Sequence, residues 1–117
     1  MPKQIKLLAI AENPVEQAHG LKYIAHMDAG MGMLFKFKAP QILNFWMAET
    51  WLPLQIAFID KDNMIVKTEQ MIPLSLRTVS SGRPCVMALE VPAGTFGDVI
   101  GKKIVLDAEN KQVIIND

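Results

Sequence analysis

The chain has 117 residues, half of them hydrophobic, which is enough for one domain with its own core and no disulfide or structural metal. Twelve basic residues balance twelve acidic ones, and no run of Lys or Arg occurs, so neither the net charge nor a local patch favours nucleic-acid binding. Cys85 is the only cysteine, which excludes an internal disulfide and a zinc site built on cysteines.

The N-terminal residues do not resemble a secretion signal, because their apolar run is short and lysines lie within it. No stretch reaches the roughly 18 uninterrupted apolar residues of a membrane span. The longest candidate, residues 42–59, is interrupted by polar residues and Pro53. We therefore expect a cytoplasmic protein without a membrane span.

The first predicted elements are a strand over residues 5–11 and a short helix. Asn13 is a good N-cap, Pro14 suits the first helical position, and Glu16 suits the third. Gly20 predicts the end of this helix after about two turns. The next segment, residues 24–32, has no clear period and is expected to be a loop.

The rest of the chain is predicted to form strands and turns. Residues 60–63 indicate a hairpin turn, and Ala108 to Asn110 indicate another. Residues 73–84 are expected to form a long loop because Ser, Gly and Pro are frequent there. The predicted strands cover residues 33–37, 45–50, 54–60, 64–71, 85–91, 104–107 and 112–115.

These patterns predict one α+β domain, mainly β, that spans residues 1–117. We expect about seven short strands in a curled sheet or a barrel-like arrangement, with one short helix. No internal repeat or linker divides the chain.

Several motifs occur together in an order that is specific to a known family. They are Gly20-Leu21, Gly32-Met33-Leu34-Phe35, Phe45-Trp46-Met47, Thr50, Leu52-Pro53-Leu54, Ile56, Phe58-Ile59-Asp60 and Leu89-Glu90-Val91-Pro92-Ala93-Gly94. Over residues 20–106 the chain resembles domain-of-unknown-function family 192, a small prokaryotic family. The resemblance implies a compact, mostly β fold and no established activity, substrate or cofactor. The chain departs from the family's usual polar residues at Ala48, Glu49 and Gln55.

Glu49 and the two tryptophans are candidates for a binding groove. In a strand over residues 45–50, Glu49 would share a face with Phe45 and Met47, and burial there would raise the pKa of its carboxyl group. The alternative, which we favour, places Glu49 at the end of the strand and in contact with solvent. Trp46 and Trp51 would either line a groove or divide between the core and the surface.

Glu90 is the stronger candidate of the two glutamates. In a strand over residues 85–91 it shares a face with Val86 and Ala88, while Cys85 shares the other face with Met87, Leu89 and Val91. The Glu90 carboxylate would point into a pocket, accept hydrogen bonds from the turn that follows, or pair with Arg77 or Arg83. We favour a structural pairing over catalysis, because Glu is seldom buried without a partner.

Other chemistries have weaker support. His26, Met27, Met31 and Met33 are close in sequence and suggest a Cu(I) site, but methionine commonly fills cores. Cys85 with His19 or His26 would be a nucleophile and base only if the fold joined them. No phosphate-binding or dinucleotide motif occurs, so we predict no cofactor and no metal.

Three functions remain after these arguments. The leading hypothesis is a non-catalytic module that binds a small molecule or peptide in a groove. Its candidate residues are Trp46, Glu49, Trp51, Arg83 and Glu90. The second is a hydrolase with Glu90 and Glu49 as an acid/base pair, which requires the two carboxyl groups within about 5–10 Å of each other. The third is a structural or protein-interaction domain, whose oligomeric state the sequence leaves open.

Overall fold

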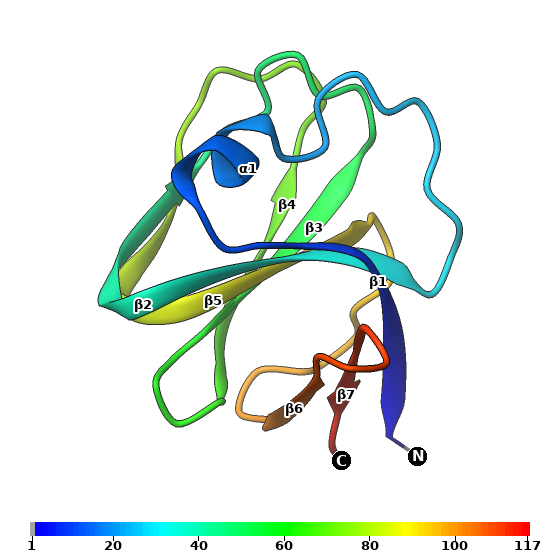
Figure 1. Ribbon diagram of the computed structural model, residues 1–117. Helices are drawn as coiled ribbons and strands as arrows, with labels where there is room; N and C mark the ends of the chain where they lie inside the picture. The colour runs from blue at the N-terminus through cyan, green and yellow to red at the C-terminus, as the bar shows by residue number, and fades with distance from the viewer. Residues whose placement is uncertain (1) are drawn as a thin grey trace.

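The computed structural model describes residues 2–117, which form one curled seven-stranded sheet and one short helix (Figure 1). The strand order is β4-β3-β5-β2-β1-β7-β6. The elements are β1 (Lys3–Ala11), α1 (Pro14–His19), β2 (Met31–Phe45), β3 (Leu54–Ile59), β4 (Ile65–Met71), β5 (Val79–Pro92), β6 (Ile104–Asp107) and β7 (Gln112–Ile115). The mainly β fold with one helix is confirmed. Among the described residues, no helix has the length and apolar character needed to cross a membrane.

The predicted first strand and helix are confirmed. The Asn13 side chain accepts a hydrogen bond of 2.9 Å from the Glu16 backbone N–H, as an N-cap does. Gly20 has a φ of 52° and donates its N–H to the Glu16 carbonyl, which ends the helix. Because β1 and β2 are parallel, the chain must cross over between them, and α1 lies in this crossover above β2 (Figure 1).

The structure corrects the predicted strands before residue 51. Residues 33–37 lie in the long strand β2, which continues through Pro40 to Phe45. A register shift between Lys36 and Gln41 interrupts the pairing with β5, so Pro40 breaks no regular ladder. Residues 46–50 form a loop instead of the predicted strand, and the Met47 N–H donates to the Ser75 carbonyl of another loop.

The predicted loop over residues 73–84 is also too long, because β5 begins at Val79. The Ser81 hydroxyl accepts a hydrogen bond from the Leu43 N–H and donates one to the Arg83 carbonyl. Ser81 thereby stabilises an irregular part of the β2–β5 pair, and Gly82 supplies a φ of 71° beside it. The Ser, Gly and Pro residues that suggested a loop therefore lie in an irregular strand.

Two predicted hairpins are confirmed. β3 and β4 pair around a turn in which the Asp60 carboxylate accepts the N–H groups of Asp62 and Met64. β6 and β7 have the predicted bounds and pair antiparallel. These turns depend on hydrogen bonds between near neighbours in sequence, which local residue types specify.

The sheet separates two groups of buried side chains. Leu89 and Val91 belong to one group, and Ala88 belongs to the other, as the alternation in β5 predicts. Cys85 is buried as expected, but it packs with Ala88 instead of with Leu89 and Val91. The register shift in the β2–β5 pair lies between Cys85 and Met87 and breaks the simple alternation there.

Gly32 lies where the backbone is most crowded. A Cβ atom at this position would lie 2.8 Å from the Glu90 carbonyl oxygen and 3.0 Å from side-chain carbons of Ile5 and Val91. Only glycine permits β2 to pack this closely against β5, and this contact positions the middle of β5, which carries Glu90.

Candidate functional site

Glu90 lies near the C-terminal end of β5, in the interior of the sheet. Its cross-strand neighbours are Met33 of β2 and Ile56 of β3, both of which are buried. The residue is only 4% exposed. The predicted pairing of Glu90 with an arginine is wrong, because Arg77 pairs with Glu69 at 2.9 Å and Arg83 lies exposed elsewhere.

No described residue forms a hydrogen bond or an ion pair with the Glu90 carboxyl group. Burial therefore acts alone and raises the pKa of Glu90 to about 8 from its ordinary value of 4.5. At pH 7 the neutral acid then outnumbers the carboxylate by roughly 10 to 1. Among the described residues, no fully buried side-chain oxygen lacks a hydrogen-bond partner, so the unpaired Glu90 carboxyl group must open onto a space that water or a ligand can enter.

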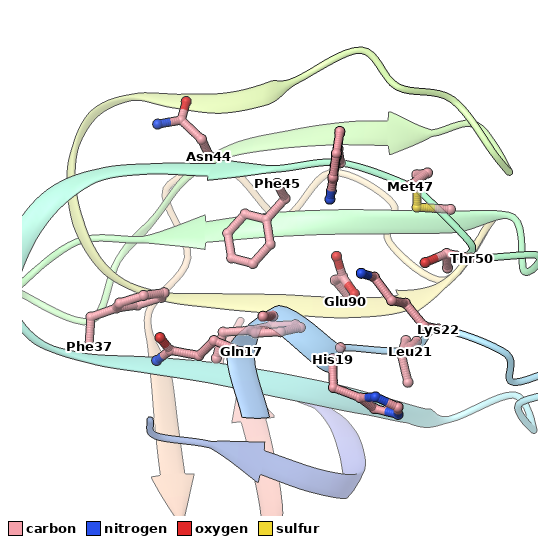
Figure 2. Close-up of a pocket in the computed structure, with 14 residues that line it drawn as sticks. Gln17, His19, Leu21, Lys22, Phe37, Asn44, Phe45, Met47, Thr50 and Glu90 are labelled. Carbon is pink, nitrogen blue, oxygen red and sulfur yellow. The ribbon is translucent and has the colours of Figure 1, made fainter. Parts of the chain in front are cut away.

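A cavity of about 280 Å³ opens above Glu90 (Figure 2). Its wall comes from α1 and the residues after it, from β2, and from the loop that follows β2. The lining residues are Gln17, Ala18, His19, Gly20, Leu21, Lys22, Phe35, Phe37, Asn44, Phe45, Trp46, Met47, Thr50 and Glu90. Glu90 is the only carboxyl group among them. A carboxyl group deep in a wall of aromatic and polar side chains is typical of a ligand site.

Aromatic rings form one side of this cavity. Phe35 and Phe45 pack edge to face, with ring centroids 4.9 Å apart and an interplanar angle of 69°. Phe37 is half-buried, whereas Trp46 is 53% exposed. The cavity therefore offers packed aromatic surface and an indole ring that solvent still reaches.

Among the described residues, some polar side chains of the wall already form hydrogen bonds within the protein, and others do not. The Gln17 amide donates to the Lys36 carbonyl at 2.9 Å, and the Thr50 hydroxyl donates to the Ala48 carbonyl at 3.2 Å. Lys22 is half-buried, and Figure 2 shows its ammonium group directed toward Glu90. Within the described residues, no ion pair of 4.0 Å or less joins Lys22 to Glu90. The cavity is thus lined by one acidic and one basic side chain that form no ion pair with each other.

The loops around the cavity contain an unusual group of backbone conformations. Tyr23, Glu49 and Leu74 have φ values of 64°, 57° and 63°, which bulky residues rarely adopt. The three loops are joined by hydrogen bonds, from the Tyr23 N–H to the Glu49 carbonyl and from the Leu74 N–H to the Thr50 carbonyl. Backbone strain of this kind concentrates at functional sites. Its presence in these loops supports a functional site at the end of the molecule that contains the cavity.

The structure brings together only some of the residues proposed from sequence. Trp46 and Glu90 line the same cavity, whereas Glu49, Trp51 and Arg83 are not among its lining residues. Glu49 reaches solvent, as the favoured interpretation held, but from a turn and not from a strand.

Tyr23 joins two of the residues that lie outside the cavity. Its hydroxyl donates to the Glu49 carboxylate, and its ring meets that of Trp51 edge-on with 6.1 Å between centroids.

The sequence pattern did not single out Lys22 or Phe37 as site residues. Phe37 could have been considered as part of an aromatic series with Phe35 and Phe45.

Three positions at which the sequence was expected to depart from the family's usual residues lie outside the cavity. Ala48, Glu49 and Gln55 are absent from its wall. The Gln55 side chain is buried and accepts a hydrogen bond of 2.9 Å from the Phe96 N–H, which stabilises the segment after β5. These departures therefore leave the residues around Glu90 in place.

A second, apolar cavity of about 490 Å³ lies between β1 and α1. It shares His19, Gly20 and Leu21 with the first cavity, and its other lining residues are mostly aliphatic. Its lining contains no buried ionisable side chain comparable to Glu90, so the cavity at Glu90 is the better candidate for specific recognition.

The alternative chemistries find no assembled site. Cys85 lies in the core, where burial raises the pKa of its thiol group and disfavours the reactive thiolate. His26 is exposed and contacts Asp28 at 2.7 Å. In the part of the chain that the structure describes, no three His, Cys, Asp or Glu side chains are grouped to hold a metal ion.

Two solved structures share this fold. One is a protein from Sinorhizobium meliloti 1021 described as a “putative transcription regulator”, with a TM-score of 0.73 and 32% identity, and the match covers 80% of each chain. The other is a protein of unknown function from Novosphingobium aromaticivorans DSM 12444, with a TM-score of 0.71 and 27% identity. That match covers 74% of this chain and 63% of the Novosphingobium chain. No curated protein matches the sequence.

The family model of DUF192, described as “Uncharacterized ACR, COG1430”, matches residues 3–104. The match spans nearly the whole chain, from β1 to the first residue of β6, and includes every residue that lines the cavity at Glu90. The resemblance inferred from the sequence motifs is confirmed, and the chain belongs to the DUF192 family.

Proposed function

We propose that this protein is a binding module for a small organic molecule, held in the cavity above Glu90. The observation that carries the proposal is the carboxyl group of Glu90. The residue is only 4% exposed, its carboxyl group has no hydrogen-bond or ion-pair partner among the described residues, and it lines a cavity of about 280 Å³. A bound molecule with a hydrogen-bonding or charged group would supply the missing partner.

The size and chemistry of the wall define the ligand further. The volume is near the lower end of the roughly 300–1,000 Å³ typical of ligand pockets, which suits a molecule with one ring or a short chain. Phe35, Phe37, Phe45 and Trp46 would pack against its apolar body. Glu90 would orient its polar end.

Catalysis by Glu90 is a second candidate, which its raised pKa favours, because an acid that titrates near neutral pH suits proton transfer. A two-carboxylate hydrolase is not supported by the wall of this cavity, since Glu49 lies outside it. If Glu90 is catalytic, the wild-type protein should convert a bound compound into a product of different mass, and the Glu90→Gln variant should not. Simple binding predicts that its mass stays unchanged in both.

The name of the Sinorhizobium protein does not lead us to propose DNA binding for this chain. α1 has only six residues, and no basic run occurs in the sequence. A recognition helix and a cationic surface are the usual means of contact with DNA.

Two experiments test the proposal. Native mass spectrometry of freshly purified protein, with a denatured control, would reveal a retained ligand by its mass. A titration of ¹⁵N-labelled protein with 2-phenylethanol, a neutral probe with one ring and one hydroxyl group, would then locate the site. We expect shifted amide signals from residues 17–22, 35–37 and 44–50.

A matched pair of variants on α1 controls for binding elsewhere. Ala18 lines the cavity, so Ala18→Trp should fill it and abolish the shifts. Val15 is 80% exposed and lines only the second cavity, so Val15→Trp should retain them. The proposal would be contradicted if no ligand mass were retained and millimolar 2-phenylethanol shifted no amide signals. Equal binding of the probe by both variants would also contradict it.

A further inference from the structure

The cavity at Glu90 is lined by one acidic and one basic side chain, Glu90 and Lys22. Lys22 follows α1, and Glu90 lies on β5, so separate segments of the fold bring them to the same cavity (Figure 2). They do not form an ion pair with each other, although Figure 2 shows the ammonium group directed toward the carboxyl group. An acidic and a basic side chain that line one cavity without an ion pair are both available to a molecule bound there.

The other residues around Glu90 limit which charges a ligand can carry. The only further ionisable side chain that lines the cavity is His19, which is exposed on α1. The cross-strand neighbours of Glu90, Met33 and Ile56, are apolar and offer no compensating charge. Since Lys22 forms no ion pair with Glu90 either, ionisation of Glu90 is costly unless a cation binds directly beside it.

A ligand with a cation alone would leave Lys22 facing a like charge, and a ligand with an anion alone would leave the neutral Glu90 carboxyl group without a partner. A molecule that carries both charges on one carbon atom satisfies the two residues together. Its apolar side group would then pack on the rings of Phe45 and Trp46.

We propose that the cavity binds a small zwitterion, an α-amino acid with an apolar or aromatic side chain, with its ammonium group on Glu90 and its carboxylate on Lys22. This inference rests on the proposed binding function and specifies its ligand class.

Four probes with the same phenyl ring separate the contributions of the charges. L-Phenylalanine carries both charges, 2-phenylethylamine lacks the carboxylate, 3-phenylpropionate lacks the ammonium group, and 2-phenylethanol has neither. Isothermal titration at pH 7 should show the tightest binding for L-phenylalanine. Each single-charge probe should bind at least about 10-fold more weakly, since hydrogen bonds to charged groups contribute roughly 1.5–3 kcal/mol.

Two variants assign the contacts. Glu90→Gln should weaken L-phenylalanine and 2-phenylethylamine by about 10-fold or more and leave 3-phenylpropionate unchanged. Lys22→Met, which keeps the apolar stem, should weaken L-phenylalanine and 3-phenylpropionate and leave 2-phenylethylamine unchanged. Glu109→Gln and Lys38→Met remove exposed charges that do not line the cavity and should change none of the affinities.

Proton release supplies an independent readout. Binding of an ammonium group to a Glu90 that is mainly neutral at pH 7 should release nearly one proton per ligand, measured from titrations in buffers of different ionisation enthalpy. Glu90→Gln should abolish this release.

The outcomes separate this inference from the proposed function. Binding of 2-phenylethanol, or of a single-charge probe, as tightly as L-phenylalanine would overturn the zwitterion inference and leave a binding module. Failure of all four probes to bind at millimolar concentration would contradict the binding function itself.

Discussion

The substitution Glu90→Gln tests whether a neutral acid lies buried in the sheet. Gln has nearly the same shape as a protonated Glu and cannot ionise. In the folded protein, burial raises the pKa of Glu90 to about 8, whereas in the unfolded chain the value is 4.5. Below pH 4.5 both states are protonated, and the carboxyl group has no pH-dependent effect on stability. Between pH 4.5 and 8 only the unfolded state is ionised, so the free energy of unfolding falls as the pH rises.

The size of the effect follows from the two pKa values. Each pH unit in this window lowers the free energy of unfolding by about 1.4 kcal/mol. From pH 5 to pH 8 the wild-type protein should therefore lose about 3 kcal/mol that the Glu90→Gln variant keeps. Because Glu90 is only 4% exposed, solvent screening weakens this effect little. The other titrating groups are the same in both proteins and cancel in the comparison.

Urea denaturation at pH 5 and pH 8 measures the difference. We expect similar stability of the two proteins at pH 5 and a variant that is more stable than the wild type at pH 8. Glu109→Gln, at an exposed turn position, controls for the loss of a carboxyl group at the surface. A stability difference between Glu90→Gln and wild type that is the same at both pH values, within about 0.5 kcal/mol, would refute the reasoning.

Three further substitutions test the parts of the fold that position the site. Gly32→Ala places a Cβ atom 2.8 Å from the Glu90 carbonyl oxygen and should lower the free energy of unfolding by about 1–3 kcal/mol, measured in urea. Gly97→Ala is the control: its Cβ atom meets no atom within 4 Å and should change stability little. Asn13→Ala removes the N-cap of α1 and should cost about 1 kcal/mol, and an unchanged denaturation midpoint would contradict this role. Leu74→Gly should relieve the positive φ and raise the stability by about 1 kcal/mol, while Leu74→Ala, measured by the same thermal scan, should not.

The sequence alone predicted the parts of this protein that depend on near neighbours. The capped helix α1, the turn after Asp60 and the hairpin of β6 and β7 follow from side-chain and backbone hydrogen bonds that span only a few residues. Strand alternation likewise placed Glu90 on the same face as Ala88, opposite Leu89. The family membership that the family model confirms was inferred from motifs that include both Gly32 and Glu90.

Tertiary contacts decided where one strand stops and another continues. Pro40 suggested a break, yet β2 continues because the register of the β2–β5 pair shifts beside it. Residues 46–50 have the composition of a strand, but the Met47 N–H bonds to Ser75, 28 positions along the chain, and the segment forms a loop. Such long-range hydrogen bonds have no signal in a local pattern.

The difference between Glu49 and Glu90 was decided in the same way. Both glutamates have apolar neighbours in sequence, but Glu49 lies exposed in a loop and Glu90 lies beneath a cavity. That cavity joins α1, β2, β5 and the loop after β2, segments that meet only when the sheet curls. The sequence specified the carboxyl group and its strand, and the packing of distant segments alone decided that it would be buried, unpaired and neutral.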